Sequence, residues 1–210
     1  MRVGVVISDF GGVLTSPLVE SFASVQDDTG VPMEALGKAM SRIEAEDGAH
    51  PLYELEKGRI AEVDFLARLA DALEPEIGHR PEMHRFAEIY FEALSPNPEM
   101  IDLMRELKAS GYRMAMLTNN VREWEPRWRS MLPVDEIFEL VVDSAFVGMR
   151  KPDTEIYELT LERLGNPAPA ECLFVDDIEA NIEAARALGL NAVHFRHQAQ
   201  AAEDIRAALS

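Results

Sequence analysis

The sequence has a single cysteine and little positive charge. Cys172 is the only cysteine, so neither an intrachain disulfide nor a cysteine-built zinc site can form, and its apolar neighbours predict a core position. The chain has 20 Lys+Arg against 38 Asp+Glu, which gives a formal net charge of −18. Such a surface does not neutralise phosphates, so we expect neither nucleic acid nor an anionic membrane as a partner.

Long apolar runs are also missing. No stretch approaches the roughly 18 residues that a membrane span needs. The apolar run 3–7 near the N-terminus is too short for the core of a signal peptide. Hydrophobic residues make up 47% of the chain and charged residues 28%, which is typical of a folded protein and not of a disordered one. These features predict a soluble, cytoplasmic protein of 210 residues with a sizeable core.

Short β-branched runs alternate with longer helical patterns along most of the chain. This alternation is typical of a parallel sheet with crossover helices, and the nearly continuous apolar runs indicate strands that are covered on both faces. The fold class that we predict is therefore α/β, with a Rossmann-like parallel sheet core of about five strands. The predicted strands are 3–8, 113–117, 139–142, 172–175 and 191–195, and the predicted helices between and after them are 98–110, 153–165, 178–189 and 198–209.

Residues 17–95 interrupt this alternation. They show only helical periodicity, as in the apolar face that Phe65, Leu69 and Leu73 share. A segment of about 80 residues is too long for a loop, so it predicts a separate helical subdomain over the sheet. We therefore predict a core of residues 1–16 and 96–210 and an inserted all-helical cap of residues 17–95.

Polar residues stand where four predicted strands end. In open α/β sheets, ligands bind beyond the carboxyl ends of the strands, so these positions are the candidate site. The candidates are Asp9 after the first strand, Thr118 and Asn119 after the second, Lys151 after the third, and Asp176 and Asp177 after the fourth.

Each of these positions alone has a plain structural interpretation, as a turn residue, a helix cap or a surface charge. The pair Asp176 and Asp177 is the hardest to explain in this way, because adjacent carboxylates after a buried strand repel each other unless a cation or hydrogen-bond donors offset them. Together the residues suit phosphoryl transfer. Carboxylates from two strands can hold Mg²⁺, Asp9 can attack phosphorus, and Thr118 and Lys151 can hold the phosphate oxygens.

In this order the motifs resemble those of the haloacid dehalogenase-like hydrolases, which are mainly Mg²⁺-dependent phosphatases. The helical insert is similar to the C1 cap of that family, so the resemblance covers essentially the whole chain. The stretch Glu56-Lys57-Gly58 in the insert and the Asp-Asp-x-x-x-Asn form at 176–181 resemble the branch that contains the phosphatase domain of soluble epoxide hydrolases.

The resemblance implies a role for each site residue. Asp9 becomes phosphorylated, and Asp9, the main-chain carbonyl of Gly11 and Asp177 bind Mg²⁺. Asp176 binds through water or orients its neighbours. The substrate phosphate is held by Thr118, Asn119 and Lys151.

Gly11 is a departure from the family pattern. The first motif is usually Asp-x-Asp, and its second Asp acts as general acid and then as general base. Glycine has no side chain to move a proton, and the loss of acid-base help slows chemistry by roughly 10²–10⁴-fold without forbidding it. A cap residue such as Glu56 or His50 is a candidate to compensate.

The expected function is Mg²⁺-dependent hydrolysis of a small phosphomonoester through an aspartyl-phosphate on Asp9. The expected partner is thus a small phosphorylated metabolite. Two alternatives stay open. One is a metal-independent haloacid dehalogenase, in which Asp9 attacks carbon, and the other is a non-catalytic, regulatory protein that binds a phosphate ligand. The sequence identifies neither the substrate nor the oligomeric state.

Overall fold

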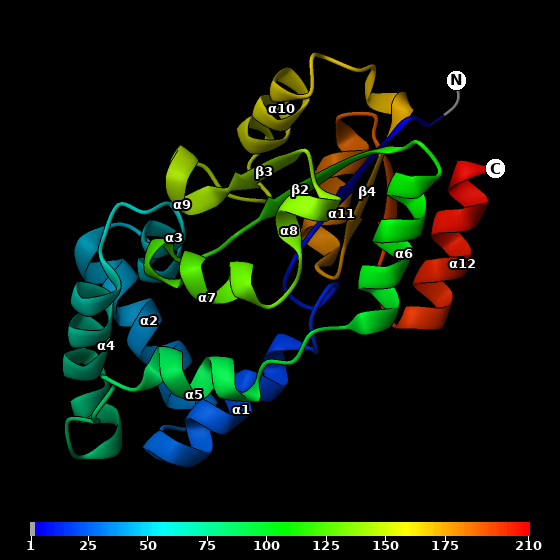
Figure 1. Cartoon of the computed structure of the whole chain (residues 1–210). Coiled ribbons are helices and arrows are strands. Elements are labelled where there is room, and N and C mark those ends of the chain that lie inside the picture. The colour runs from blue at the N-terminus through cyan, green and yellow to red at the C-terminus, as the bar shows by residue number, and fades with distance from the viewer. Residues whose placement is uncertain (1–2) are drawn as a thin grey trace.

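A computed structural model describes residues 3–210 and has a five-stranded parallel sheet at its centre, in the order β3-β2-β1-β4-β5 (Figure 1). All five predicted strands are present, which confirms the predicted α/β class. The first of them begins two residues later than predicted. The strands are β1 (Val5–Ser8), β2 (Arg113–Thr118), β3 (Leu140–Asp143), β4 (Cys172–Asp176) and β5 (Asn191–His194).

Helices cover both faces of the sheet. Because strand side chains alternate between the faces, Val6 and Val175 belong to one hydrophobic cluster, while Ile7 and Phe174 belong to another. Cys172 is fully buried in the second cluster, as expected for a core residue. The first cluster includes residues of α6 (Pro98–Ala109) and α12 (Gln198–Leu209), and the second includes residues of α10 (Thr154–Arg163) and α11 (Glu179–Ala187).

Short helical segments lie in the connections of the core. Each is six residues long or less, so none shows enough turns for helical periodicity to appear in the sequence. They were not predicted for this reason. They are η1 (Arg122–Trp124), α7 (Glu125–Ser130), α8 (Val134–Ile137), α9 (Ser144–Val147) and η2 (Pro169–Glu171).

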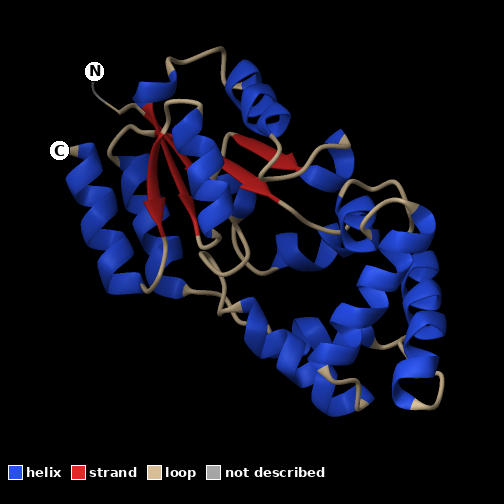
Figure 2. Ribbon diagram, turned by 180° about the vertical axis from the view of Figure 1, so that it is seen from behind, coloured by secondary structure: helices blue, strands red, loops and turns tan. Residues whose placement is uncertain are grey.

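The insert after β1 is helical. Its helices form two pairs, α1 with α5 and α2 with α4, while α3 lies nearer the core (Figures 1 and 2). Phe65, Leu69 and Leu73 of α4 are buried together, as their spacing predicted. The helices are α1 (Leu18–Thr29), α2 (Met33–Asp47), α3 (Pro51–Glu56), α4 (Glu62–Ile77) and α5 (Phe86–Ala93).

The two chain segments that join the insert to the sheet run side by side. Thr15 and Pro96 form an antiparallel bridge, and the N–H of Ser16 donates to the carbonyl of Ser95 at 2.7 Å. The predicted boundaries lie at this pairing, since residue 17 directly follows it and residue 95 is part of it. The division into two domains stays a prediction. Among the residues described, no helix has the length and apolar character needed to cross a membrane.

Candidate active site

The candidate residues meet at the carboxyl edge of the sheet. Asp9 follows β1, Thr118 ends β2, and Asp176 ends β4. Since β1 lies between β2 and β4 and all three are parallel, their ends come together at one place. Lys151 lies in the loop between α9 and α10, and its side chain reaches the same place. Four segments that are far apart in the sequence thus supply a single site.

Lys151 is the central positive charge of this site. Its side chain is only 1% exposed, and Nζ lies 2.8 Å from Oδ1 of Asp9 and 2.6 Å from Oδ2 of Asp176. Burial by itself lowers the pKa of Lys151, but the carboxylates of Asp176 and Asp9 outweigh it and leave the pKa raised. Lys151 is therefore a charged, buried group, and the alternative interpretation as a surface charge is wrong.

Three carboxylates lie near this one ammonium group, and two of them are paired with it. Asp9, Asp176 and Asp177 each have an oxygen within 4.8 Å of the others. Burial raises the pKa of Asp9 well above its usual range; Lys151 opposes this shift, and Asp176 and Asp177 add to it. Burial also raises the pKa of Asp177 to about 6, and Asp176 contributes further. The site holds more negative charge than Lys151 balances, and three hard oxygen donors at this spacing fit a divalent cation.

Asp176 and Asp177 differ in how their oxygens are used. Oδ1 of Asp176 accepts hydrogen bonds from the N–H of Ile178 at 2.8 Å and from Nδ2 of Asn181 at 2.9 Å, while Oδ2 accepts from Lys151. Asp177 lines a cavity, and no other described side chain holds its carboxylate. The carboxylate of Asp177 is therefore open to a ligand, whereas the carboxylate of Asp176 binds Lys151 and Asn181. The contact between Asn181 and Asp176 was not predicted, although the Asp-Asp-x-x-x-Asn form at 176–181 contains both residues.

Thr118 and Asn119 lie beside Lys151. Thr118 is buried at the end of β2. The side chain of Asn119 holds the main chain of Lys151 on both sides: Nδ2 donates to the Lys151 carbonyl at 2.9 Å, and the Lys151 N–H donates to Oδ1 at 2.8 Å. The Asn119 amide side chain therefore has a structural partner, which leaves its main-chain N–H as the group available for a phosphate.

Gly11 and Gly12, in the loop after β1, differ in whether a side chain could replace the glycine hydrogen. Gly12 has a φ of +74°, and a Cβ there would lie 2.1 Å from Oδ2 of Asp177, so any side chain would displace that carboxylate. Gly11 carries no positive φ. A Cβ at Gly11 would lie 3.0 Å from the flexible end of Leu18. Position 11 thus accepts a side chain when Leu18 moves or is shortened, whereas position 12 does not.

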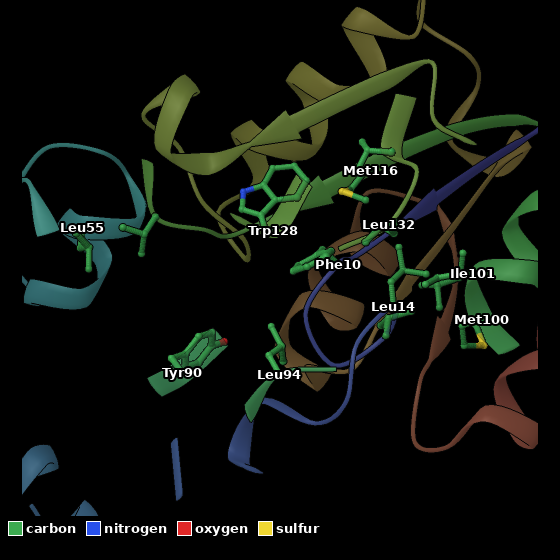
Figure 3. Packing of buried hydrophobic residues seen from close by; sticks show 14 of the residues in the cluster. Phe10, Leu14, Leu55, Tyr90, Leu94, Met100, Ile101, Met116, Trp128 and Leu132 are labelled. Atoms are coloured by element: carbon green, nitrogen blue, oxygen red, sulfur yellow. The ribbon is translucent and has the colours of Figure 1, made fainter. Parts of the chain in front are cut away.

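A cavity of about 640 Å³ extends from Asp9 into the helical insert. Its floor includes Asp9, Lys151 and Asp177 from the core, while most of its wall is apolar and comes from the insert. Figure 3 labels Phe10 of the core and Leu55 and Tyr90 of the insert, three buried side chains that line this cavity. Apolar residues of the wall that are only partly buried include Leu18, Phe22, Leu36, Met40, Leu66 and Phe91.

Arg150 links the insert to the core at this cavity. Its Nε lies 2.6 Å from Oε2 of Glu56, and its guanidinium carbon lies 3.9 Å from the ring centre of Tyr53. Burial raises the pKa of Glu56, and Arg150 opposes the shift. Of the two residues considered as substitutes for the missing acid, Glu56 lines the cavity, whereas His50 stacks on Tyr53 at 4.2 Å and is not part of the described lining. Arg150 was not predicted as a site residue, and its position next to Lys151 was the only feature of the sequence that pointed to it.

Comparison with known proteins identifies the family. The model of the haloacid dehalogenase-like hydrolases matches residues 3–189, so the chain belongs to this family of hydrolases. It is 30% identical over 200 residues to phosphatase MT3486 of Mycobacterium tuberculosis, across 91% of this chain and 87% of that protein. It is 38% identical over 109 residues to sesquiterpene phosphatase astK of Aspergillus oryzae, across 49% of this chain.

Other relatives are longer than this chain. It is 24% identical over 217 residues to bifunctional epoxide hydrolase 2 of Mus musculus, across 98% of this chain. The match spans 38% of that protein, so the chain corresponds to part of it, and the match to the sesquiterpene phosphatase spans 52% of that protein.

Solved structures share the fold. A magnesium complex of the HAD family enzyme bt-2542 from Bacteroides thetaiotaomicron has a TM-score of 0.64 and 23% identity, over 93% of this chain and 94% of that one. L-2-haloacid dehalogenase from Xanthobacter autotrophicus has a TM-score of 0.63 and 21% identity, over 99% of this chain and 84% of that one. Because a metal-bound enzyme and a dehalogenase both match, the fold does not choose between the two chemistries.

Proposed function

We propose that the protein hydrolyses a small phosphomonoester with the help of Mg²⁺, through an aspartyl-phosphate on Asp9. The observation that carries this proposal is the cluster of Asp9, Asp176 and Asp177, whose oxygens lie within 4.8 Å of one another. Among the described residues its one ion-pair partner is Lys151, which contacts Asp9 and Asp176. A dehalogenase that needs no metal has no use for this excess of negative charge. The names of relatives agree with the reaction, since several are called phosphatases.

The donor set fits Mg²⁺, which prefers one or two carboxylates together with waters and substrate oxygens. Asp9, Asp177 and the main-chain carbonyl of Gly11 would hold the ion. Asp176, whose oxygens already accept hydrogen bonds from Lys151, Asn181 and Ile178, would act through water or by orienting these neighbours. When bound, the ion supplies the positive charge that lets an anionic phosphate approach three carboxylates.

The residues of the chain would then carry out two displacements. An oxygen of Asp9 attacks phosphorus, and the bond between phosphorus and the alcohol oxygen breaks. The departing oxygen takes a proton from solvent water, because Gly11 has no side chain to donate one, and the alcohol leaves. Water next attacks the phosphorus of phosphorylated Asp9, which restores the carboxylate and releases inorganic phosphate. In both steps Lys151, the Thr118 hydroxyl and the Asn119 N–H would hold the phosphate oxygens.

We further propose that residues 17–95 act as a cap that closes over the site. The insert contacts the core through Glu56, which pairs with Arg150, and through Glu62, whose Oε1 accepts a hydrogen bond from Trp124 Nε1 at 2.7 Å. Both links lie along the wall of the cavity. Closure of such a segment excludes water and selects the substrate.

Removal of Mg²⁺ is expected to stop turnover. With excess EDTA, hydrolysis of p-nitrophenyl phosphate should fall on the order of 10³-fold, because several kcal/mol of transition-state stabilisation are lost with the cation. Added MgCl₂ should restore the rate. An unchanged rate of hydrolysis in EDTA would contradict the metal-dependent mechanism. Metal-independent release of chloride from 2-chloropropionate would favour the dehalogenase, and no turnover on a broad panel of phosphomonoesters would favour the binding protein.

An acid at position 11 is expected to help poor leaving groups. Because a Cβ there meets only the end of Leu18, we expect the double variant Gly11→Asp/Leu18→Ala to fold and to hydrolyse alkyl phosphates about 10–100-fold faster than Leu18→Ala alone. The rate on p-nitrophenyl phosphate, whose alcohol leaves without a proton, should change little. Gly11→Asn/Leu18→Ala is the matched control of equal size, and equal rates for the Asp and Asn variants would contradict the prediction.

A further inference from the structure

The cavity has a polar end and an apolar end. The polar end lies at the sheet, where Asp9, Lys151 and Asp177 line it. The apolar end lies in the insert, between the helix pair α1 and α5 and the helix pair α2 and α4. Side chains such as Phe22 of α1 and Leu36 of α2 face this space and are only partly buried by the protein itself. An apolar surface of this kind indicates a bound apolar group.

The two carboxylates that the insert adds to the wall have partners, and the hydroxyls of Tyr53 and Tyr90 are the other polar side-chain groups that it contributes. Glu56 is paired with Arg150 at 2.6 Å, and Glu62 accepts a hydrogen bond from Trp124 at 2.7 Å. The hydroxyls of a sugar or polyol placed here would lose water and meet mainly hydrocarbon, which costs free energy for each unpaired group. An alkyl or prenyl chain in the same space would bury no unpaired polar group and would gain free energy for each methylene removed from water.

We propose that the organic group of the substrate is a long, flexible apolar chain, and that Gly37 sets the length that fits. This inference rests on the proposed phosphatase function, because the phosphate must lie at Lys151 for the chain to point into the insert. A cavity of about 640 Å³ is of the size that holds a drug-sized ligand. The names of relatives do not decide the matter, since they include both a sesquiterpene phosphatase and a ribulose-1,5-bisphosphate 5-phosphatase.

Gly37 is the position in the insert's part of the wall where a side chain is missing. It lies inside α2 between Met33 and Met40, and these three residues all line the cavity. Their spacing puts them on one face of the helix. Gly37 is exposed and helical, and a Cβ there would meet no atom within 4 Å, so a side chain can be added at this position without a clash at its first atom. Glycine is among the least favourable residues in a helix, and its presence here leaves room in the cavity.

A chain-length series tests this proposal. We would measure kcat/KM for butyl, hexyl, octyl and decyl phosphate below their micelle concentrations, with glycerol 3-phosphate as the polar comparison. For the unaltered protein we expect kcat/KM to rise by about threefold to fourfold per added methylene until the cavity is full. Gly37→Phe should keep the rate on butyl phosphate and lose about 30-fold or more on decyl phosphate, which corresponds to roughly three excluded methylenes.

Gly37→Ala is the matched control, because it changes the helix in the same direction but fills little space. We expect it to lose at most about threefold to fourfold on decyl phosphate, which corresponds to one excluded methylene. Since alanine favours helix, its Tm should be at least as high as that of the unaltered protein. A Gly37→Phe Tm close to that of Gly37→Ala shows that the protein is folded. If Gly37→Phe fails to fold, Gly37→Leu replaces it in the same comparison.

The outcomes separate this inference from the proposed function. Turnover of butyl phosphate with no gain along the series, or a preference for glycerol 3-phosphate, would overturn the apolar substrate and leave the phosphatase intact. Equal losses on all chain lengths in Gly37→Phe would overturn the role of Gly37. If the protein turns over none of these phosphates, calorimetry with alkylphosphonates in MgCl₂ measures binding instead. Affinity that grows with chain length in the absence of any turnover would support the apolar site and reject the phosphatase, whereas constant affinity would reject both.

Discussion

Asp9→Asn is expected to lower kcat on any phosphomonoester substrate by on the order of 10⁵-fold or more, because loss of the attacking group removes the covalent route altogether. The asparagine side chain keeps an oxygen that can accept from Lys151 and from the N–H of Phe10, which now donates to Asp9 at 2.7 Å. The fold should therefore survive. The measurement is a single-turnover assay, together with a search for phosphorylated protein by intact mass after acid quenching.

Two control measurements show whether a lower rate in Asp9→Asn comes from the missing nucleophile or from a loss of folded structure. The Asp9→Asn variant should unfold in urea with the same m-value as the unaltered protein, since m reports the surface exposed on unfolding. The unaltered protein should carry one extra phosphoryl group during turnover, and the variant none. Turnover that persists in Asp9→Asn, or a phosphoryl group found on another residue, would reject Asp9 as the nucleophile.

Lys151→Met is expected to cause the largest loss of stability among single changes at the site. Removal of this ammonium leaves the carboxylates of Asp9 and Asp176 buried without a counter-ion, and breaking a buried ion pair in this way costs about 3–5 kcal/mol of the free energy of unfolding. Methionine has a similar length and is apolar, so little of the loss comes from packing. Urea unfolding at pH 7 in EDTA measures the effect without a metal.

Lys57→Met is the matched control within the same chain. Its ion pair with Asp153, at 3.4 Å, lies near the surface, where such pairs contribute about 0–1 kcal/mol. The double variant Asp9→Asn/Lys151→Met should lose less than the sum of the two single changes, because the first removes a charge that the second would strand. Equal losses for Lys151→Met and Lys57→Met would show that the buried pairing does not stabilise the fold.

The main elements of the fold were predictable because their signals are local. β1 and β4 are nearly continuous apolar runs, and such runs identify strands that are covered on both faces. The face of Phe65, Leu69 and Leu73 likewise shows its helical period in the sequence. The helices α7, α8 and α9 escaped prediction, because four to six residues form too few turns to give a periodic pattern.

The candidate site was predictable in part. Parallel strands bring their carboxyl ends to one edge, so the positions of Asp9, Thr118 and Asp176 follow from their places after strands. The contacts that distinguish their roles do not follow in this way. Asn181 occupies one oxygen of Asp176, and the side chain of Asn119 holds the main chain of Lys151, through contacts between residues brought close only by the fold.

The sequence by itself determined the α/β class, the helical insert and the set of residues that form the candidate site, because strand patterns and the polar residues that follow them are properties of neighbours in the chain. Only the tertiary structure decided that Lys151 is buried between two carboxylates and that the insert encloses an apolar cavity. An apolar residue looks the same in the sequence whether it fills a core or lines a cavity. The difference depends on how far apart the helices pack, and that distance is set by contacts across the whole molecule.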